Sequence, residues 1–262
     1  MTGTREGAAV ETDSALKYHY SDFTREAYRS LLRTARASYV FRSYDTFDPQ
    51  ERFVLWRHDL DFSVHAASAL AEIEAQEQVS STYFLLLHSD FYNLLERDVS
   101  RKVERILALG HRIGLHFDCG YYGISSVAQL EDMLAMEARL LERVFGQRID
   151  VFSFHNPDAW MLQQREVRYA GLLNTYSEFF RDQVGYCSDS NGYWRHRRLA
   201  DVLEQAADHS LQVLTHPGWW VDEPMSPRDR IARCAEGRAA ATMRKYDEDL
   251  ACFGRDNIGK ST

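Results

Sequence analysis

Residues 53–61 read Phe-Val-Leu-Trp-Arg-His-Asp-Leu-Asp, an apolar run that ends in charged side chains. In an extended strand alternate side chains share a face, so Arg57, Asp59 and Asp61 can point one way while His58 points the other. Two carboxylates on one face repel each other unless a cation lies between them or one of them stays protonated. The alternative is that both aspartates cap the helix that follows, because aspartate is favoured at helix N-termini.

Similar apolar segments recur along the chain and alternate with helix-like stretches. The expected strands are 53–59, 81–87, 112–117, 151–155, 173–177, 186–189 and 212–215. The expected helices are 22–35, 64–76, 99–108, 127–145, 198–207 and a last one from 228 onward. Short, continuously apolar strands separated by helices indicate a parallel sheet that is buried on both faces. Such a chain forms an α/β barrel or a doubly wound sheet, and either places its active site at the C-terminal ends of the strands.

Histidines stand at the ends of three of these strands: His116, His155 and His216. One such histidine is more often a hydrogen-bonded core residue, but three of them, together with Asp59 and Asp61, are hard to attribute to packing. An aspartate with two histidines is a three-ligand set that leaves positions on a divalent metal open for water and substrate. The metal polarises a carbonyl and lowers the pKa of bound water, and hydrolysis then needs a base and an acid. The second aspartate and the remaining histidine suit these two roles.

The composition favours a single acidic domain with a full core. Of the 262 residues, 45% are hydrophobic and 13% are aromatic, so disorder is excluded. No linker or internal repeat divides the chain, so we expect a flexible lead-in over residues 1–14, one domain over 15–254 and a polar tail over 255–262. The net charge of −8 disfavours a nucleic acid or an anionic membrane as partner. The sequence does not predict an oligomeric state.

The N-terminus and the cysteines indicate a cytoplasmic protein. Residues 1–20 are polar and lack the apolar core of a secretory signal, and the apolar run 83–87 is far too short to span a membrane. The four cysteines are widely spaced and form no Cys-x-x-Cys pair. This pattern fits reduced thiols better than a zinc knuckle or a disulfide framework.

The segments that carry these aspartates and strand-end histidines resemble the polysaccharide deacetylase superfamily, in the branch whose first motif reads Arg-His-Asp-Val/Leu-Asp. The resemblance covers about residues 22–225, and its most specific parts are 57–63 and 110–116. Later segments follow in the order that the family would place them: 154–157, 188–194 and 214–217. The resemblance implies a single-domain, distorted (β/α)7 barrel, smaller than the usual eight-unit barrel. It also implies a metal-dependent hydrolase of a non-peptide C–N bond, as in the deacetylation of an amino sugar.

The family's functional residues can be carried over onto the matching positions. The resemblance implies that Asp59 is the general base and His216 the general acid. It makes Asp61 and His116 metal ligands. The two aspartates could be exchanged, because Leu60 separates what is usually an adjacent pair. The metal is a divalent ion, and we expect Zn²⁺.

The sequence departs from the family's second motif, which usually reads His-x-x-x-His. Gly120 stands four residues after His116 and cannot bind a metal, so we assign the missing ligand to His155, with Asp118 as the alternative. The changed pocket implies that the substrate need not be an N-acetyl sugar polymer. We expect a small molecule, such as a sugar, a nucleotide sugar or another amide-bearing metabolite.

Several aromatic and polar residues are candidates for substrate binding. Trp219 and Trp220 could form an aromatic wall against a sugar ring, or could merely cover the end of the barrel. Four further candidates lie near the motifs: Asp118, Tyr121, Asn156 and Trp194.

Charged residues near the motifs have two interpretations each. Arg57 could pair with Asp59 or bind a substrate carboxylate. Asp189 could hold His216 or the substrate, or could simply form a turn. Residues 195–198, Arg-His-Arg-Arg, could attract the phosphate of a nucleotide sugar or form a solvated helix start.

Three functions remain open from the sequence. The first is a metal-dependent deacetylase or amidohydrolase. The second keeps the metal site but forms or exchanges an amide, as a transferase or a ligase-like enzyme does. The third is a catalytically silent barrel that binds a ligand, which we disfavour because the aspartates and the three histidines are all present.

Overall fold

The alternation of strands and helices expected from the sequence is present in the computed structural model, which describes residues 13–259. A short helix, α1 (Asp13–Lys17), begins the described part. The predicted flexible lead-in falls largely on residues 1–12, and the predicted polar tail ends with 260–262. Both of these stretches lie outside the described residues.

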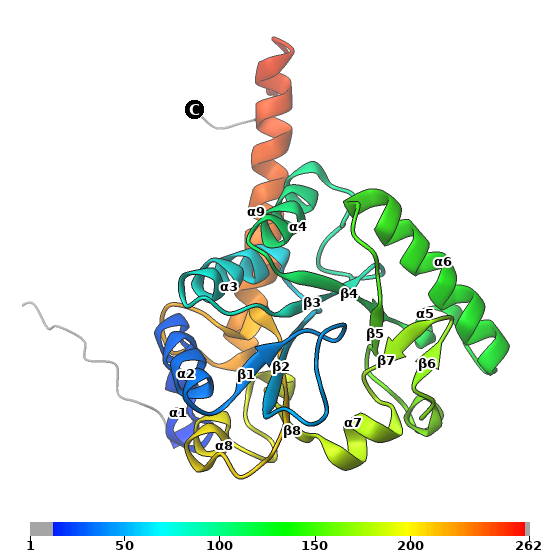
Figure 1. Ribbon diagram of the computed structural model, residues 1–262. Coiled ribbons are helices and arrows are strands. Elements are labelled where there is room, and N and C mark those ends of the chain that lie inside the picture. Colours follow the sequence, from blue (N-terminus) through cyan, green and yellow to red (C-terminus); the bar gives the residue numbers. More distant parts are fainter. Residues whose placement is uncertain (1–12, 260–262) are drawn as a thin grey trace, which may run out of the picture.

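One mixed sheet organises the described chain. Its strands are β1 (Val40–Arg42), β2 (Phe53–Leu60), β3 (Thr82–Leu86), β4 (Arg112–Phe117), β5 (Val151–Phe154), β6 (Arg168–Tyr169), β7 (Leu172–Asn174), β8 (Gly185–Ser188) and β9 (Leu211–Thr215). Their order is β6-β7-β5-β4-β3-β2-β9-β8, and β1 pairs with the first half of β2. Only β6 and β7 are antiparallel among the described pairs. The parallel strands from β7 to β8 curl into the predicted distorted (β/α)7 barrel, which is open where the described β7 and β8 do not pair (Figure 1).

Most of the helices after α1 cover the outside of this curled sheet. The helices are α2 (Arg25–Ser38), α3 (Val64–Gln76), α4 (Arg97–Ala108), α5 (Cys119–Tyr122), α6 (Val127–Phe145), α7 (Glu178–Gln183), α8 (Leu199–Gln205) and α9 (Pro227–Cys252). In Figure 1, α2, α3, α4 and α6 lie around the rim, with the strands between them. The helices expected at 64–76 and 127–145 have the predicted bounds, whereas α5, α7, β1 and β6 were not predicted.

Serine caps fix where two of the helices begin. The side chain of Ser63 accepts a hydrogen bond from the backbone N–H of Ala66, so Ser63 caps α3. The idea that the preceding aspartates cap this helix is therefore wrong, and their carboxylates need another explanation. In the same way Ser126 caps α6: its hydroxyl accepts from the N–H of Gln129, and the helix ends at Gly146 with a φ of 67°.

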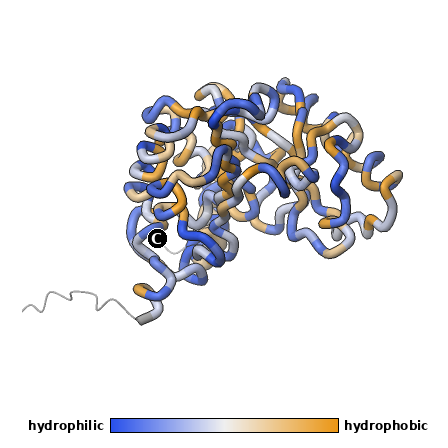
Figure 2. Tube along the Cα trace, turned by 60° about the horizontal axis from the view of Figure 1, so that its bottom comes forward, coloured by the Kyte–Doolittle hydropathy of each residue, from blue (hydrophilic) through white to orange (hydrophobic). Residues whose placement is uncertain are grey.

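The sheet separates an outer apolar layer from an inner one. Outward side chains such as Val54 and Trp56 pack in a cluster with α2 and α8. Inward side chains such as Leu55, Phe84 and Val151 fill the lower part of the barrel. Figure 2 shows the resulting pattern, with hydrophobic segments concentrated inside and hydrophilic ones on the outer turns.

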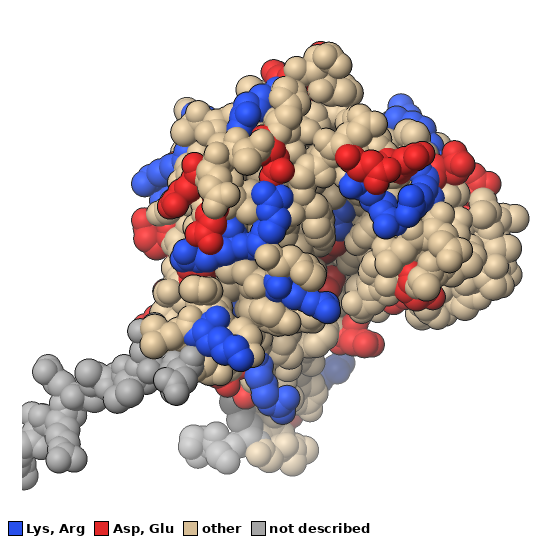
Figure 3. All heavy atoms as spheres, turned by 90° about the horizontal axis from the view of Figure 1, so that it is seen from below, with Lys and Arg blue, Asp and Glu red and all other residues tan. Residues whose placement is uncertain are grey.

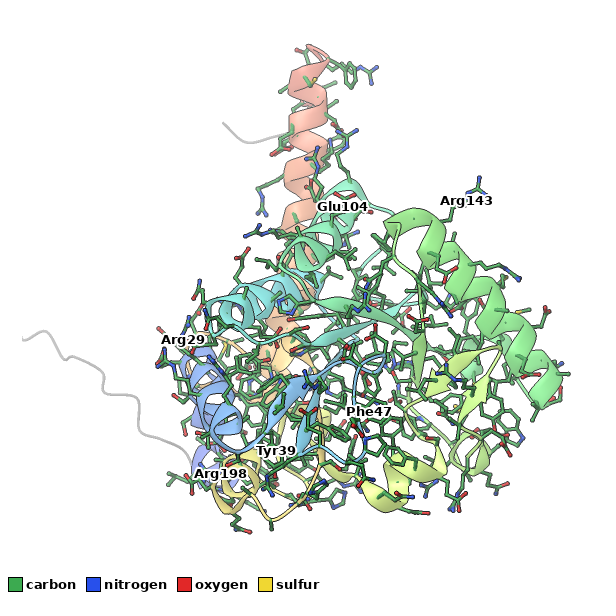
Figure 4. All side chains as sticks on the ribbon, in the orientation of Figure 1. Arg29, Tyr39, Phe47, Glu104, Arg143 and Arg198 are labelled. Atoms are coloured by element: carbon green, nitrogen blue, oxygen red, sulfur yellow. The ribbon has the colours of Figure 1, made fainter. Side chains whose placement is uncertain are left out.

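The loop between β1 and β2 closes one end of the barrel. Phe47 from this loop packs against Phe53 at the start of β2 and against Phe180 of α7. Figure 4 shows Phe47 in the middle of the view, over the strands, whereas Arg143 points away from the body. The N-terminal end of the barrel is thus covered by aromatic rings, and the opposite end carries the polar residues.

The last helix, α9, extends well beyond the rest of the molecule (Figure 1). Within the described residues, no helix combines the length and the apolar character needed to cross a membrane. Figure 3, seen from below, shows basic and acidic side chains interspersed on one face. All four cysteines are free thiols, as the sequence predicts.

Candidate metal centre

Three strand ends bring Asp61, His116 and His155 together. Asp61 follows β2, His116 is in β4 and His155 follows β5, and one ligand atom of each lies within 4.8 Å of the other two. His116 Nε2 is 3.1 Å from Asp61 Oδ1, and the two imidazole rings have centroids 5.2 Å apart. In residues 13–259 no other group of three such side chains lies at this spacing. These are the three side chains that the sequence singled out as ligands.

Both histidines are held in place through Nδ1. His116 Nδ1 is 2.8 Å from Ser153 Oγ, and His155 Nδ1 is 3.1 Å from Asp118 Oδ2. Partners of this kind fix the orientation of an imidazole ring and leave Nε2 for a metal. His155 Nε2 accepts a hydrogen bond from the side-chain amide of Asn156 at 2.9 Å, so Asn156 competes for this nitrogen.

Unpaired carboxylate oxygens make the cluster suitable for a cation. Asp59 Oδ1 and Asp61 Oδ1 are buried, and neither has a hydrogen-bond partner in the part of the chain that the structure describes. The close contact of Asp61 with His116 lacks hydrogen-bond geometry. A buried oxygen of this kind is costly unless a cation neutralises it. One carboxylate and two imidazoles are also typical ligands of Zn²⁺, so these residues fit a divalent metal.

Histidine side chains on several sides keep Asp61 ionised. Burial raises the pKa of Asp61, but the contact with His116 and the charges of His216 and His155 lower it more. The net pKa therefore lies well below its ordinary value. An ionised carboxylate is the form that binds a metal.

Asp59 lies deeper in the barrel and is paired with Arg57. Arg57 donates from Nη2 to Asp59 Oδ2 at 2.8 Å and from Nη1 to Thr175 Oγ1 at 2.8 Å. His58 points to the opposite side of β2, where its ring nitrogen donates to Glu74 at 2.7 Å. The alternation predicted for this strand is confirmed. Of the two interpretations of Arg57, the structure supports the one in which it pairs with Asp59.

His216, after β9, is fixed by a buried aspartate. Its Nδ1 is 2.6 Å from Asp189 Oδ1, and its backbone N–H also donates to Asp189. Trp220 donates from Nε1 to the second oxygen of Asp189 at 3.0 Å. Burial lowers the pKa of His216, but the charge and the hydrogen bond of Asp189 raise it more, to about 9. His216 Nε2 is 3.7 Å from Asp61 Oδ2, so this proton-bearing group borders the candidate metal centre.

A cavity of about 690 Å³ opens above the centre. Side chains from several strand ends line it: Asp61, Phe62, His88, Asp90, Asp118, His155, Asn156, Ser190, Asn191, Arg195, His216 and Trp219. Of the residues predicted to bind substrate, Asp118, Asn156 and Trp219 are among them. A volume of this size suits a small molecule.

The other predicted substrate-binding residues lie away from the cavity surface. Arg57, Asp189 and Trp220 are buried behind it. Trp194 stacks on Phe23 in the outer core and donates to Asp22. Tyr121 is 63% exposed and stacks on His88, beside the cavity.

Three residues of the site were missed in the sequence. Ser153 holds His116, and its place two residues before His155, on the same face of β5, was a usable signal. His88 follows β3 as the other histidines follow their strands, and it lines the cavity. No local sequence pattern marks Thr175, because its role comes from a hydrogen bond with Arg57, which is 118 positions away in the chain.

No protein-family model and no curated protein matches this sequence. Among solved structures, the fold is similar to polysaccharide deacetylases and related proteins of the CE4 family. One is a CE4 family pseudoenzyme from Bacillus anthracis, with 14% identity and a TM-score of 0.42 over 72% of this chain and 63% of that chain. A second is a family 4 acetyl xylan esterase from Clostridium thermocellum in complex with a cobalt ion, with 12% identity and a TM-score of 0.41 over 78% of this chain and 92% of that one. A third is the peptidoglycan deacetylase PdaC from Bacillus subtilis, with 13% identity and a TM-score of 0.41 over 78% and 98% of the two chains.

Proposed function

We propose that this protein is a metal-dependent hydrolase that removes an acyl group, such as acetyl, from the nitrogen of a small substrate. The observation that carries the proposal is the convergence of Asp61, His116 and His155, with Asp59 and His216 beside them. Amide hydrolysis of this kind needs three things: ligands for a metal, a base and an acid. The site offers a ligand set, a carboxylate with a free oxygen and a histidine that can donate a proton.

The three clustered side chains would hold the metal, and Zn²⁺ fits two imidazoles and one carboxylate. A metal bound there would polarise the substrate carbonyl and activate water. Ser153 and Asp118 fix the two rings, so the chain arranges its ligands before the metal arrives.

Asp59 acts as the base in this mechanism. Arg57 holds Asp59 Oδ2, while Oδ1 has no partner among residues 13–259 and can take a proton from the attacking water. The buried guanidinium also keeps the carboxylate in one orientation, so that its free oxygen does not turn away.

His216 acts as the acid. Asp189 holds Nδ1, which leaves Nε2 on the side of Asp61 to deliver a proton to the leaving nitrogen. A leaving amine must be protonated because it departs poorly as an anion. Asp189 does not touch the substrate and is therefore a positioning residue.

The substrate carries an anionic group, such as a phosphate, next to the acylated part. Arg197 pairs with Asp208 and Arg198 with Asp22. Arg195 is left as the one arginine or lysine that lines the cavity in the described chain. Replacing Arg195 with Gln should raise KM for an N-acetylated sugar phosphate more than KM for the neutral sugar, and equal effects on both would contradict an anionic substrate.

The test begins with the purified protein and its metal content. We expect about one divalent ion per chain, and we expect release of acetate from N-acetylglucosamine or its phosphates that stops when a chelator removes the metal. Incorporation of ammonia into an acid, without net hydrolysis, would instead identify an amide-forming enzyme. A metal-free protein whose stability is unaffected by chelators would identify a ligand-binding barrel.

A further inference from the structure

A second pair of an acid and a histidine borders the cavity, apart from His216 and Asp189. Glu137 of α6 is 1% exposed, and its helix neighbours Leu134, Ala138 and Leu141 belong to the largest apolar cluster of the described residues. Its Oε1 accepts a hydrogen bond from Tyr122 at 2.6 Å and one from His88 Nε2 at 2.8 Å. A buried carboxylate in apolar surroundings is expensive, so its position is set by the groups that it holds.

His88 is fixed on two of its sides. Its Nε2 is bound to Glu137, and one ring face is covered by Tyr121, with centroids 3.6 Å apart and planes 11° from parallel. The ring also borders the cavity that contains Asp61. In residues 13–259, Nδ1 has no hydrogen-bond partner. The one unused polar atom of an otherwise immobilised ring is therefore available to a molecule in the cavity.

From this arrangement we infer that His88 binds the substrate, through a hydrogen bond that Nδ1 accepts from a hydroxyl group outside the bond that is cleaved, since Nε2 carries the proton donated to Glu137. Glu137 is the positioning residue for this contact, because it holds the ring through Nε2. The inference rests on the proposed function, since it assigns a substrate contact in the same cavity. A ring oriented in advance loses little conformational freedom on binding and so contributes more affinity.

The short helix α5 links this contact to the candidate metal centre. Asp118 Oδ1 accepts from the backbone N–H of Tyr121 and caps the helix, while Oδ2 is 3.1 Å from His155 Nδ1. One carboxylate thus positions both His155 and the helix whose tyrosines hold His88.

The experiment compares the metal-loaded wild type with His88→Ala, using N-acetylglucosamine as the probe. We expect its Kd by calorimetry to rise at least tenfold with metal content unchanged, and any fall in Tm to be modest because Tyr122 still donates to Glu137. If turnover is measurable, KM should rise by a similar factor while kcat falls less than threefold. His209→Ala is the matched control, because this exposed histidine precedes β9 at the far end of the strands.

Two further variants separate positioning from folding. Glu137→Gln keeps an acceptor oxygen but removes the charge, and Tyr122→Phe removes the other donor to Glu137; each should raise Kd at least threefold. The combination of Glu137→Gln with His88→Ala should bind no worse than His88→Ala alone. An equal Kd for the wild type and His88→Ala, or no binding by the wild type, overturns the inference. A wild type that binds the sugar without hydrolysing it overturns the proposed function alone.

Discussion

Arg57 and Asp59 form a buried ion pair on one face of β2, with Nη2 2.8 Å from Oδ2. Two residues further along the same face, Asp61 contacts His116 instead. One strand thus presents two carboxylates in different surroundings: one is paired with an arginine inside the barrel, and the other lies among histidines at its mouth. The different partners give the two aspartates different expected roles.

Substitution of the two aspartates should separate catalysis from metal binding. Asp59→Asn removes the base but no proposed ligand, so we expect turnover to fall at least about 100-fold with the metal retained. Asp61→Asn and His116→Ala should both lose the metal. Elemental analysis of the three purified variants, beside their kcat, checks this. Loss of metal from Asp59→Asn would show that the roles are the reverse.

The pH dependence of activity should depend on Asp189. Because Asp189 raises the pKa of His216 to about 9, the ring stays protonated up to that pH, and activity should decline only above it. Asp189→Asn keeps an acceptor for the ring but removes the charge, so the alkaline limb of kcat/KM should move to lower pH by one unit or more. An unmoved limb would mean that another group supplies the proton.

A buried network around Glu74 should govern stability in acid. Glu74 accepts from Tyr83, Ser81 and His58 in the core between β2, β3 and α3. Burial raises its pKa, but the charge and hydrogen bond of His58, the charge of His111 and a hydrogen bond from Tyr28 lower it more, from 4.5 to about 2. This carboxylate therefore contributes stability above pH 4.5 that is lost as the pH falls towards 2, and the amount is about 3 kcal/mol.

Denaturant unfolding of Glu74→Gln measures this contribution. At pH 7 the free energy of unfolding should fall by about 3 kcal/mol. The side-chain amide of the new glutamine places an N–H donor against hydroxyl groups that also donate, so buried hydrogen bonds are lost. Between pH 4.5 and 2 the variant should lose less stability than the wild type. Glu72→Gln on the same helix, which breaks only a half-exposed pair with Arg105, should cost less than about 1 kcal/mol.

Gly114 allows β4 to pass close to the side chains that fill the barrel. A Cβ at this position would lie 2.8 Å from the ring of Phe84 and 3.0 Å from Val151. Gly114→Ala should therefore reduce the free energy of unfolding by about 1–3 kcal/mol. Gly237→Ala is the control: it lies in α9 with nothing within 4 Å, so the same change should be neutral or stabilising by up to about 1 kcal/mol. Equal effects on Tm would contradict the crowding around β4.

The sequence predicted most of the fold because each buried strand carries its own apolar signal. The strands and main helices were placed within a few residues, and 112–117 has the predicted bounds. β6 and α5 could not be predicted in this way, since elements of two and four residues have too few side chains to show a period. They depend on contacts with distant segments.

The candidate site, like the fold, could be predicted only in part. Asp61, His116 and His155 were found because a polar residue at the end of an apolar strand is conspicuous in the sequence. Trp220 was predicted to line the pocket, but it is buried and donates to Asp189. Whether an aromatic side chain turns inward or outward after a strand depends on the packing of the neighbouring helices. The local sequence therefore does not predict the direction of such a side chain.

The three clustered side chains come from segments that are far apart in the chain, since Asp61 and His155 are 94 positions apart. No short fragment contains them all, so the centre can assemble only after β2, β4 and β5 have taken their places in the sheet, with β3 between β2 and β4. A cation bound there would act as a cross-link between three strands of the finished barrel. Metal uptake should accordingly follow folding, and should slow unfolding more than it speeds refolding.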